Sequence, residues 1–361
     1  MSNKTLIIGE AGVNHNGEER LAFQLVDLAV KAGVDIVKFQ IFNSNKLVTR
    51  FAKKADYQSR NTGESGSQIS MLKSLELSLD SHQKIAKYAT KSGIQYLSSA
   101  FDTESLRFLA EEIGVTLFKV SSGDLTNAPF LLEHARYKRK IVVSTGMATL
   151  GDIEDALGVL AFGFLDSGEA PSVSAFRDAY LSGDGQDALK EYVTLLHCTT
   201  EYPTRPDEVN IASMTTLKQA FQLDVGYSDH SVGHVASVMA VALQAGILEK
   251  HFTLDTAMKG PDHSASMGPS ELVEFVSAIR GAEMCLGSSV KRPMPSEVKN
   301  ASVARRSLVA SKPIATGDRF DTGNLSVMRP GTGLSPIRYW EVLGSKSARD
   351  YQEGELIDPR P

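Results

Sequence analysis

The chain has 361 residues, of which 42% are hydrophobic and 22% charged, and its formal net charge at neutral pH is -5. This composition is typical of a globular protein, and the acidic balance with dispersed lysines and arginines argues against nucleic-acid binding. Two cysteines, Cys198 and Cys285, stand in no metal-binding or redox spacing, which fits a reducing compartment. The apolar run at the start is too short for a signal peptide, and no stretch approaches a membrane span, so we expect a cytoplasmic protein.

Taken in order, the chain repeats one pattern: a short β-branched run, a polar cluster at its end, and then a helical segment. Eight strands are expected, at residues 6–12, 35–42, 94–101, 117–124, 140–147, 193–199, 224–230 and 247–252. Helices are expected at residues 17–33, 78–93, 102–114, 209–222, 235–243 and 270–287. Near-continuous apolar strands in eight β/α units predict a closed (β/α)8 barrel, or TIM barrel, rather than an open sheet. Functional residues should then lie at the carboxyl ends of the strands.

Two segments interrupt the repeat. Residues 43–68 are too polar to form core, so they predict a loop or lid beside the barrel mouth. Residues 163–191 predict an insertion of short helix and loop before the sixth strand.

The composition changes again after Leu286. Residues 288–305 have two prolines, several serines and no apolar period, so they predict a linker between a barrel domain at 1–287 and a second domain at 306–361. The second domain has short strands punctuated by glycine and proline, with one brief helix near 336–343. A domain of about 55 residues has a small core, so we expect it to lean on another surface or to act as a stabilising appendage.

Two histidines stand at the ends of neighbouring strands. His230 and His251 are separated by an apolar run, residues 235–243, that suits a crossover helix. Neighbouring parallel strands lie roughly 4.8 Å apart, so two imidazoles at matching ends can share one cation. The period of two places Glu249 on the same face as His251 and sends Lys250 to the other face. The alternative is a pair of ordinary hydrogen-bonded histidines, and two histidines alone are a weak signal.

The strand ends also carry lysines, hydroxyls and glycines. Lys38 and Lys119 stand within apolar strands, where an unpaired charge is costly, so each must be paired or functional. A phosphorylated anion needs point charges, short donors and free backbone amides, although Ser, Thr and Gly at a strand end also form plain turns. Together these features predict a phosphate-bearing substrate beside a divalent metal. The strand-end residues include Glu10, Asn14, His15, Asn16, Gln40, Ser98, Ser99, Ser121, Ser122, Gly123, Ser144, Thr145 and Gly146.

Many short segments, spread in order over nearly the whole chain, carry a family resemblance. They are EAGVNHNG, VKFQ, KADYQ with NTGES, FKVSSGD, VVSTGMAT, LLHCTTEYP, GYSDHS, ILEKHFTLD, GPDHSAS and MRPGTGLSP. With these segments the chain resembles the sialic acid (N-acetylneuraminate) synthases, which condense phosphoenolpyruvate with an N-acetylhexosamine. The resemblance implies a metal-dependent barrel followed by a small, mainly β antifreeze-like (SAF) domain. It also implies a domain-swapped homodimer, in which the tail of one subunit covers the barrel mouth of the other.

The resemblance also implies a role for each matching residue. His230 and His251 would bind Mn²⁺ or Mg²⁺. Phosphoenolpyruvate would be held by Lys38, Lys119, Ser99, Ser122, Ser144 and Ser228. The sugar or water side would be lined by Glu10, Gln40, Tyr202, Glu249 and Asp262, and Arg329 would reach the sugar's N-acyl group from the partner subunit. The chain departs from common family residues at Ala100 and Thr200, which leaves the acceptor sugar in doubt.

The sequence therefore predicts an N-acetylneuraminate synthase that acts on N-acetylmannosamine for surface polysaccharide synthesis. Its metal would polarise the sugar aldehyde, and a carboxylate such as Glu10 or Glu249 would act on water. One alternative is the same reaction on a 2,4-diacetamido-2,4,6-trideoxyhexose, giving N,N'-diacetyllegionaminate. Another is a non-catalytic carbohydrate-binding barrel. The retained histidines and lysines argue against a binding protein, because a binder needs no metal beside a phosphate site.

Overall fold

The computed structural model describes residues 4–49, 51–62 and 67–358. The chain forms two compact units, Met1–Gly287 and Ser288–Pro361. Part of the NTGES segment quoted above, residues 63–65, lies outside the described residues.

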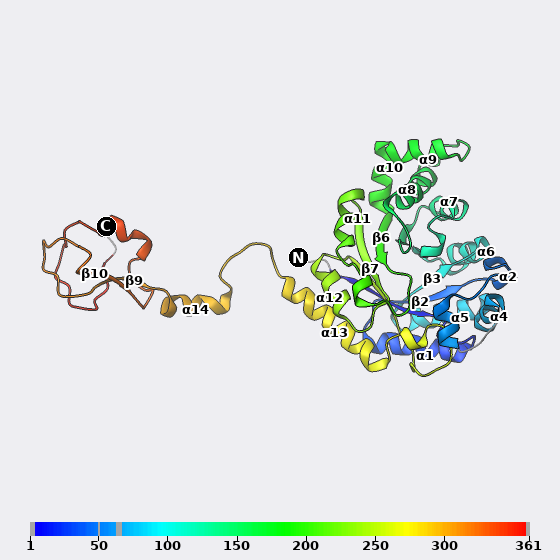
Figure 1. Ribbon diagram of the computed structural model, residues 1–361, viewed down its shortest axis with the longest axis horizontal. Coiled ribbons are helices and arrows are strands. Elements are labelled where there is room, and N and C mark those ends of the chain that lie inside the picture. Colours follow the sequence, from blue (N-terminus) through cyan, green and yellow to red (C-terminus); the bar gives the residue numbers. More distant parts are fainter. Residues whose placement is uncertain (1–3, 50, 63–66, 359–361) are drawn as a thin grey trace. The chain divides into compact units, whose positions relative to one another are not determined.

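The first unit is a closed barrel of eight parallel strands, paired in chain order and surrounded by helices (Figure 1). The strands are β1 (Leu6–Gly12), β2 (Ile36–Ile41), β3 (Gln95–Ala100), β4 (Leu117–Val120), β5 (Lys140–Ser144), β6 (Val193–Cys198), β7 (Asp224–Asp229) and β8 (Ile247–His251). The predicted (β/α)8 fold is confirmed. Every strand lies within its expected range, but β7 ends at Asp229, so His230 follows this strand as the first residue of the loop.

Side chains that point into the barrel are arranged in layers. The lower layer, the apolar floor, consists of Ile8, Ile36, Leu97, Val142, Leu196 and Ile247, with Leu117 packed against it. Two residues further along, the strands carry the polar ring: Glu10, Lys38, Ser99, Lys119, Ser144, Cys198, Ser228 and Glu249. Because strand side chains alternate with a period of two, both layers face the same interior. On β7 the floor position is Gly226, where a Cβ would meet Ile247 O at 2.3 Å, so only glycine fits.

The outer faces of the strands pack on helices in one large apolar core, which includes Ile7, Phe39 and Phe118. The helices are α1 (Glu19–Ala32), α5 (Leu79–Lys91), α6 (Thr103–Arg107) with a π-helical turn (Phe108–Ile113), α7 (Ala128–Arg136), α8 (Leu150–Leu165), α11 (Ser213–Phe221), α12 (Val235–Ala242) and α13 (Pro269–Leu286). Local signals set their ends. The α8 helix, for example, begins with a capping box between Thr149 and Asp152.

In the part of the chain that the structure describes, both interruptions contain short helices. Residues 43–68 include α2 (Ser44–Leu47), α3 (Asp56–Thr62) and the start of α4 (Gln68–Leu75). Their polarity predicted no core, yet Leu47 packs against a small apolar cluster of Val13, Phe42 and Leu75. Asn61 donates a hydrogen bond to Pro261 O at 2.7 Å, which ties this segment to the loop after β8. Residues 163–191 contain the end of α8, then α9 (Val173–Leu181) and most of α10 (Gly183–Tyr192), as expected for mixed helix and loop.

The second unit contains α14 (Pro295–Ala304), β9 (Ser307–Ala310), β10 (Leu325–Met328) and α15 (Tyr339–Val342). The strands pair antiparallel over a core that includes Leu308, Phe320 and Tyr351. Within residues 288–305, the predicted linker, α14 occupies residues 295–304, a helix that the sequence did not predict. This helix needs no apolar face: Pro295 starts it, Glu297 caps the Met294 N–H at 2.8 Å, and none of its residues is buried. In the described part of the chain, no helix has the length and apolarity to cross a membrane.

Candidate active site

Four charged side chains of the polar ring form one buried cluster. Lys38 Nζ lies 2.6 Å from Glu10 Oε2 and 3.5 Å from Glu249 Oε2. Lys119 Nζ lies 3.8 Å from Glu249 Oε1. No side chain of the four is more than 6% exposed. Each lysine is therefore paired with a carboxylate, as a buried charge requires.

The two carboxylates of this cluster have opposite pKa shifts. Burial raises the pKa of Glu10 to about 7, with Lys38 opposing the rise and Glu249 adding to it. Burial also acts to raise the pKa of Glu249, but Lys119 and Lys38 outweigh it and bring this pKa to about 2. Glu249 therefore stays ionised, whereas Glu10 can gain or lose a proton near neutral pH.

The lysines also contact hydroxyl groups of the ring. Lys119 Nζ donates to Ser144 Oγ at 2.7 Å and to Val120 O at 3.1 Å. Lys38 Nζ donates to Ser99 Oγ at 3.4 Å. These contacts hold both ammonium groups beside short hydroxyls, an arrangement that suits phosphate oxygens.

Gly146 leaves only a very small space among three neighbouring side chains, those of Ser122, Cys198 and Thr200. Ser122 Oγ accepts a hydrogen bond from Gly146 N at 3.0 Å and lies 3.2 Å from Cys198 Sγ. A Cβ at Gly146 would fall 2.4 Å from Thr200 Oγ1, so any larger residue would fill the space. Thr200 Oγ1 is buried and has no hydrogen-bond partner among the described residues. We call Ser122, Gly146, Cys198 and Thr200 the Gly146 cradle, and its hydroxyls are donors that suit the oxygens of an anion.

The two histidines lie together above the polar ring. Their ring centroids are 5.5 Å apart, and the Tyr202 ring lies 4.2 Å from that of His230 and 5.5 Å from that of His251. His230 Nδ1 donates to Thr199 O at 2.6 Å, which leaves the lone pair on Nε2. His251 Nδ1 is buried and finds no partner in the described part of the chain. Burial lowers the pKa of His230 to about 4 and that of His251 further below its usual range.

This donor set fits a divalent cation, because both imidazoles are neutral at pH 7 and offer nitrogen lone pairs. Among the described residues, no three His, Cys, Asp or Glu side chains are grouped closely enough to surround a metal. His230 and His251 would therefore supply two ligands, and water or substrate oxygens would supply the rest, as Mn²⁺ and Mg²⁺ accept.

The structure brings most of the predicted site residues together at the carboxyl end of the barrel. Gln40 Nε2 donates to Glu10 Oε1 at 3.1 Å, and Ser228 Oγ donates to Glu249 Oε1 at 2.9 Å and lies 3.3 Å from His230 Nε2. The predicted residues that gather there are Glu10, Lys38, Gln40, Ser99, Lys119, Ser122, Ser144, Tyr202, Ser228, His230, Glu249 and His251.

Two predicted residues belong to other segments of the chain. Asp262 is buried in the loop after β8, where burial raises the pKa of its carboxyl to about 6. Arg329 is exposed on the second unit. Sequence reasoning also missed two residues of the Gly146 cradle as ligand groups, Cys198 and Thr200. The available signal was the strand period, which sends Cys198 to the same interior as Leu196.

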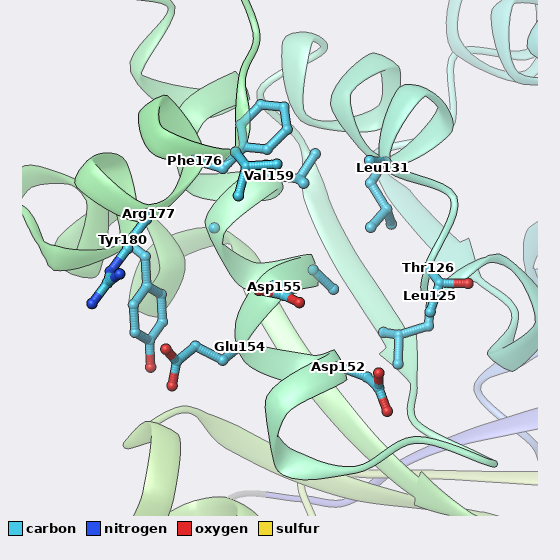
Figure 2. Close-up of a pocket in the computed structure, with 14 residues that line it drawn as sticks. Leu125, Thr126, Leu131, Asp152, Glu154, Asp155, Val159, Phe176, Arg177 and Tyr180 are labelled. Carbon is cyan, nitrogen blue, oxygen red and sulfur yellow. The ribbon is translucent and has the colours of Figure 1, made fainter.

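A separate cavity of about 490 Å³ lies between α7, α8 and α9 (Figure 2). Leu131, Val159 and Phe176 line its apolar part, and Glu154 and Arg177 stand at its edge. No residue of the polar ring lines this cavity, so it is distinct from the candidate active site.

Comparisons with known proteins agree with this geometry. The NeuB family profile matches residues 25–291, and the SAF domain profile matches residues 305–359. The chain is 45% identical over 354 residues to the N,N'-diacetyllegionaminic acid synthase of Campylobacter jejuni, which covers 98% of this chain and 99% of that protein. It is 38% identical to the Legionella pneumophila protein of the same name, over 97% and 92% of the two chains. The N-acetylneuraminic acid (sialic acid) synthetase of Leptospira borgpetersenii, solved with citrate, aligns with a TM-score of 0.65 and 29% identity over 83% of this chain and 90% of that one.

Proposed function

Because the chain belongs to the NeuB family and carries a SAF domain, we propose that it condenses phosphoenolpyruvate with an N-acetylated amino sugar to form a nonulosonic acid. One observation carries the proposal: paired buried lysines, hydroxyl groups beside them and two neutral imidazoles meet in one barrel mouth. A carbohydrate-binding protein would need neither the buried lysines nor the imidazole pair.

In this proposal the polar ring binds and orients phosphoenolpyruvate. Lys38 and Lys119 hold its charged groups, while Ser144 and the Gly146 cradle receive phosphate oxygens. His230 and His251 would hold a divalent metal, which when bound would supply Lewis-acid polarisation of the sugar aldehyde. Holding the two reactants in contact lowers the barrier to forming the bond between the phosphoenolpyruvate methylene carbon and the aldehyde carbon.

Glu10 is the group best suited to move protons in this reaction. When the carbon bond forms, the aldehyde oxygen becomes a hydroxyl and needs a proton, which a neutral Glu10 can donate. The Glu10 carboxylate can then accept a proton from the water that adds to the phosphate-bearing carbon. The resulting tetrahedral intermediate expels phosphate by C–O cleavage and leaves the keto acid. Glu249, which stays ionised, balances the charges of Lys38 and Lys119.

For the acceptor we propose the 2,4-diacetamido-2,4,6-trideoxyhexose rather than N-acetylmannosamine, the sugar that the sequence placed first. Identities of 45% and 38% to two diacetyllegionaminic acid synthases, against 29% to a sialic acid synthetase, support this choice. The test offers each sugar separately to purified protein with Mn²⁺ and phosphoenolpyruvate, and measures released phosphate and product mass. Turnover of N-acetylmannosamine alone would reverse the choice of sugar. If no phosphate is released with either sugar in the presence of phosphoenolpyruvate and Mn²⁺, the result would count against a synthase.

Filling the Gly146 cradle should weaken phosphoenolpyruvate binding. We expect Gly146→Ala to raise the KM for phosphoenolpyruvate at least about tenfold, because the new methyl group would crowd Thr200 Oγ1 and Ser122 Oγ. The matched control is Gly183→Ala at the start of α10, where a Cβ meets nothing within 4 Å. Steady-state kinetics with each substrate varied in turn will check this. An unchanged KM for phosphoenolpyruvate in Gly146→Ala would show that the Gly146 cradle does not take part in binding phosphoenolpyruvate.

We also propose that the protein acts as a cytoplasmic homodimer with exchanged SAF domains. The α12 helix supports association, because it is apolar on all sides and leaves Val235 69% and Met239 48% exposed. Both cysteines are free thiols, in keeping with a reducing compartment.

Exchanged domains make a specific prediction for Arg329. If this side chain completes the sugar site of the partner subunit, Arg329→Ala should raise the sugar KM by about tenfold, the effect of losing one charged hydrogen bond. Refolding Arg329→Ala together with His251→Ala should then restore part of the activity, because one mouth of the mixed dimer has an intact barrel and an intact tail. Mixed dimers that form, as seen by mass spectrometry, yet gain no activity would favour a site completed within one chain.

A further inference from the structure

A second buried ion pair lies directly behind the two histidines, on the outer face of the barrel wall. Lys250 Nζ is 3.1 Å from Asp229 Oδ2, and these side chains are 2% and 0% exposed. The two residues are register partners on the neighbouring strands β7 and β8. Each stands next in the chain to one histidine: Asp229 precedes His230, and Lys250 precedes His251. The pair therefore joins the two backbone segments from which the imidazoles project.

Asp229 also fixes the backbone on both sides of His230. Its Oδ1 accepts hydrogen bonds from Ser231 N at 2.8 Å and Ser231 Oγ at 2.7 Å, so the carboxylate closes a ring around the His230 peptide. Its Oδ2 accepts from Ser237 Oγ at 2.6 Å, which connects this ring to α12. With these partners, every oxygen of the carboxylate is used.

Lys250, on the neighbouring strand β8, binds the same turn at residues 229–231. Its ammonium group donates to Ser231 O in addition to pairing with Asp229. The His230 carbonyl is held independently, since it accepts from Thr204 N at 2.8 Å. On the other side, His251 O accepts from Met267 N at 2.9 Å. The Asp229–Lys250 pair is thus a direct side-chain link between the two histidine-bearing segments, in addition to the pairing of β7 with β8 and the Ser228–Glu249 hydrogen bond.

We infer that Asp229 and Lys250 are positioning residues that set the spacing of His230 and His251 and thereby the affinity for the divalent cation. A buried ion pair is a poor source of stability, because desolvation offsets much of its attraction and apolar replacements are often neutral. The ion pair does, however, fix the relative positions of two backbone segments. Mutation of residues that orient metal ligands commonly lowers metal affinity by about 10- to 100-fold. The inference rests on the proposed function, because it requires that the histidines bind a metal.

The test measures Mn²⁺ binding by the metal-free protein through the electron paramagnetic resonance signal of free Mn²⁺, without substrates. The main variant is the double substitution Asp229→Asn with Lys250→Met, which removes both charges together and keeps an oxygen to accept from Ser231 N. We expect its Kd for Mn²⁺ to rise at least about tenfold. The matched control is Arg280→Met. Arg280 is on α13, and its Nη2 lies 2.6 Å from Oδ2 of Asp35, the residue before β2, so this substitution breaks an ion pair elsewhere in the barrel. This control should lower the melting temperature and leave the Mn²⁺ Kd unchanged.

The outcomes separate the positioning role from stability and from the metal site itself. A folded double variant that binds Mn²⁺ within twofold of the wild type overturns the inference, whatever its melting temperature. If the double variant does not fold, Asp229→Asn alone decides the matter: weakened Mn²⁺ binding supports the inference, and wild-type affinity overturns it. Wild-type protein that fails to bind Mn²⁺, or a His251→Ala variant that binds it normally, would instead show that the proposed metal site is wrong.

Discussion

His251→Ala is expected to lower Mn²⁺-dependent turnover by roughly a thousandfold, because a bound Lewis acid contributes several kcal/mol to the transition state and each 1.36 kcal/mol is about tenfold in rate. The imidazole stands above the apolar floor, so its loss should leave the barrel folded, as circular dichroism would show. Turnover and Mn²⁺ binding should be measured together. His230→Ala is expected to behave in the same way.

The matched control for this prediction is His197→Ala. His197 also stands near the end of a barrel strand, but its Nε2 donates to Val209 O at 2.8 Å on the outer side. This variant should keep its Mn²⁺ dependence even if it is less stable. Full activity of His251→Ala in chelated buffer would contradict the metal assignment.

Lys119→Met is expected to raise the KM for phosphoenolpyruvate by roughly thirtyfold, since a hydrogen bond to a charged group contributes about 2 kcal/mol. The KM for the sugar should change much less, because Lys119 donates to Ser144, one of the proposed phosphate-binding residues. Methionine keeps much of the side-chain volume, so the packing of the polar ring is largely retained. Kinetics with each substrate varied in turn will measure the two constants.

Lys140→Met provides the control for Lys119→Met. Lys140 begins β5 and is exposed, and it pairs in register with Leu117 at the opposite end of the neighbouring strand. The same substitution there should leave both constants unchanged. Equal effects of Lys119→Met on the two substrates would argue for general damage to the mouth rather than loss of a phosphate contact.

The barrel was predictable because each strand has a residue pattern that can be recognised within a few neighbouring positions. The run ILEKHF predicted by parity alone that Glu249 and His251 share a face, and Glu249 indeed lies in the polar ring below His251. Lys38 and Lys119 were predicted to be paired or functional, and the structure places a carboxylate beside each of them. Such inferences depend only on neighbours within one strand.

Features that depend on several strands meeting could not be predicted in this way. The Gly146 cradle exists because Ser122, after β4, and Cys198 and Thr200, at the end of β6 and after it, converge on the glycine that follows β5. Parity showed that Lys250 faces away from the histidines, but only the register of β7 with β8 identifies its partner. The α14 helix was missed for another reason: its ends are capped locally, and it has no buried face to produce an apolar period.

The apolar floor has a consequence for the order of events during turnover. Floor side chains from seven strands and the close approach at Gly226 fill the barrel interior beneath the polar ring. Every molecule must therefore come and go through the same opening. At the ends of β7 and β8 the histidines stand two residues beyond the polar ring that contains the lysines, so phosphoenolpyruvate in its proposed position would be covered by the sugar. We therefore expect an ordered reaction, in which phosphoenolpyruvate binds before the sugar and the nonulosonic acid leaves before the phosphate.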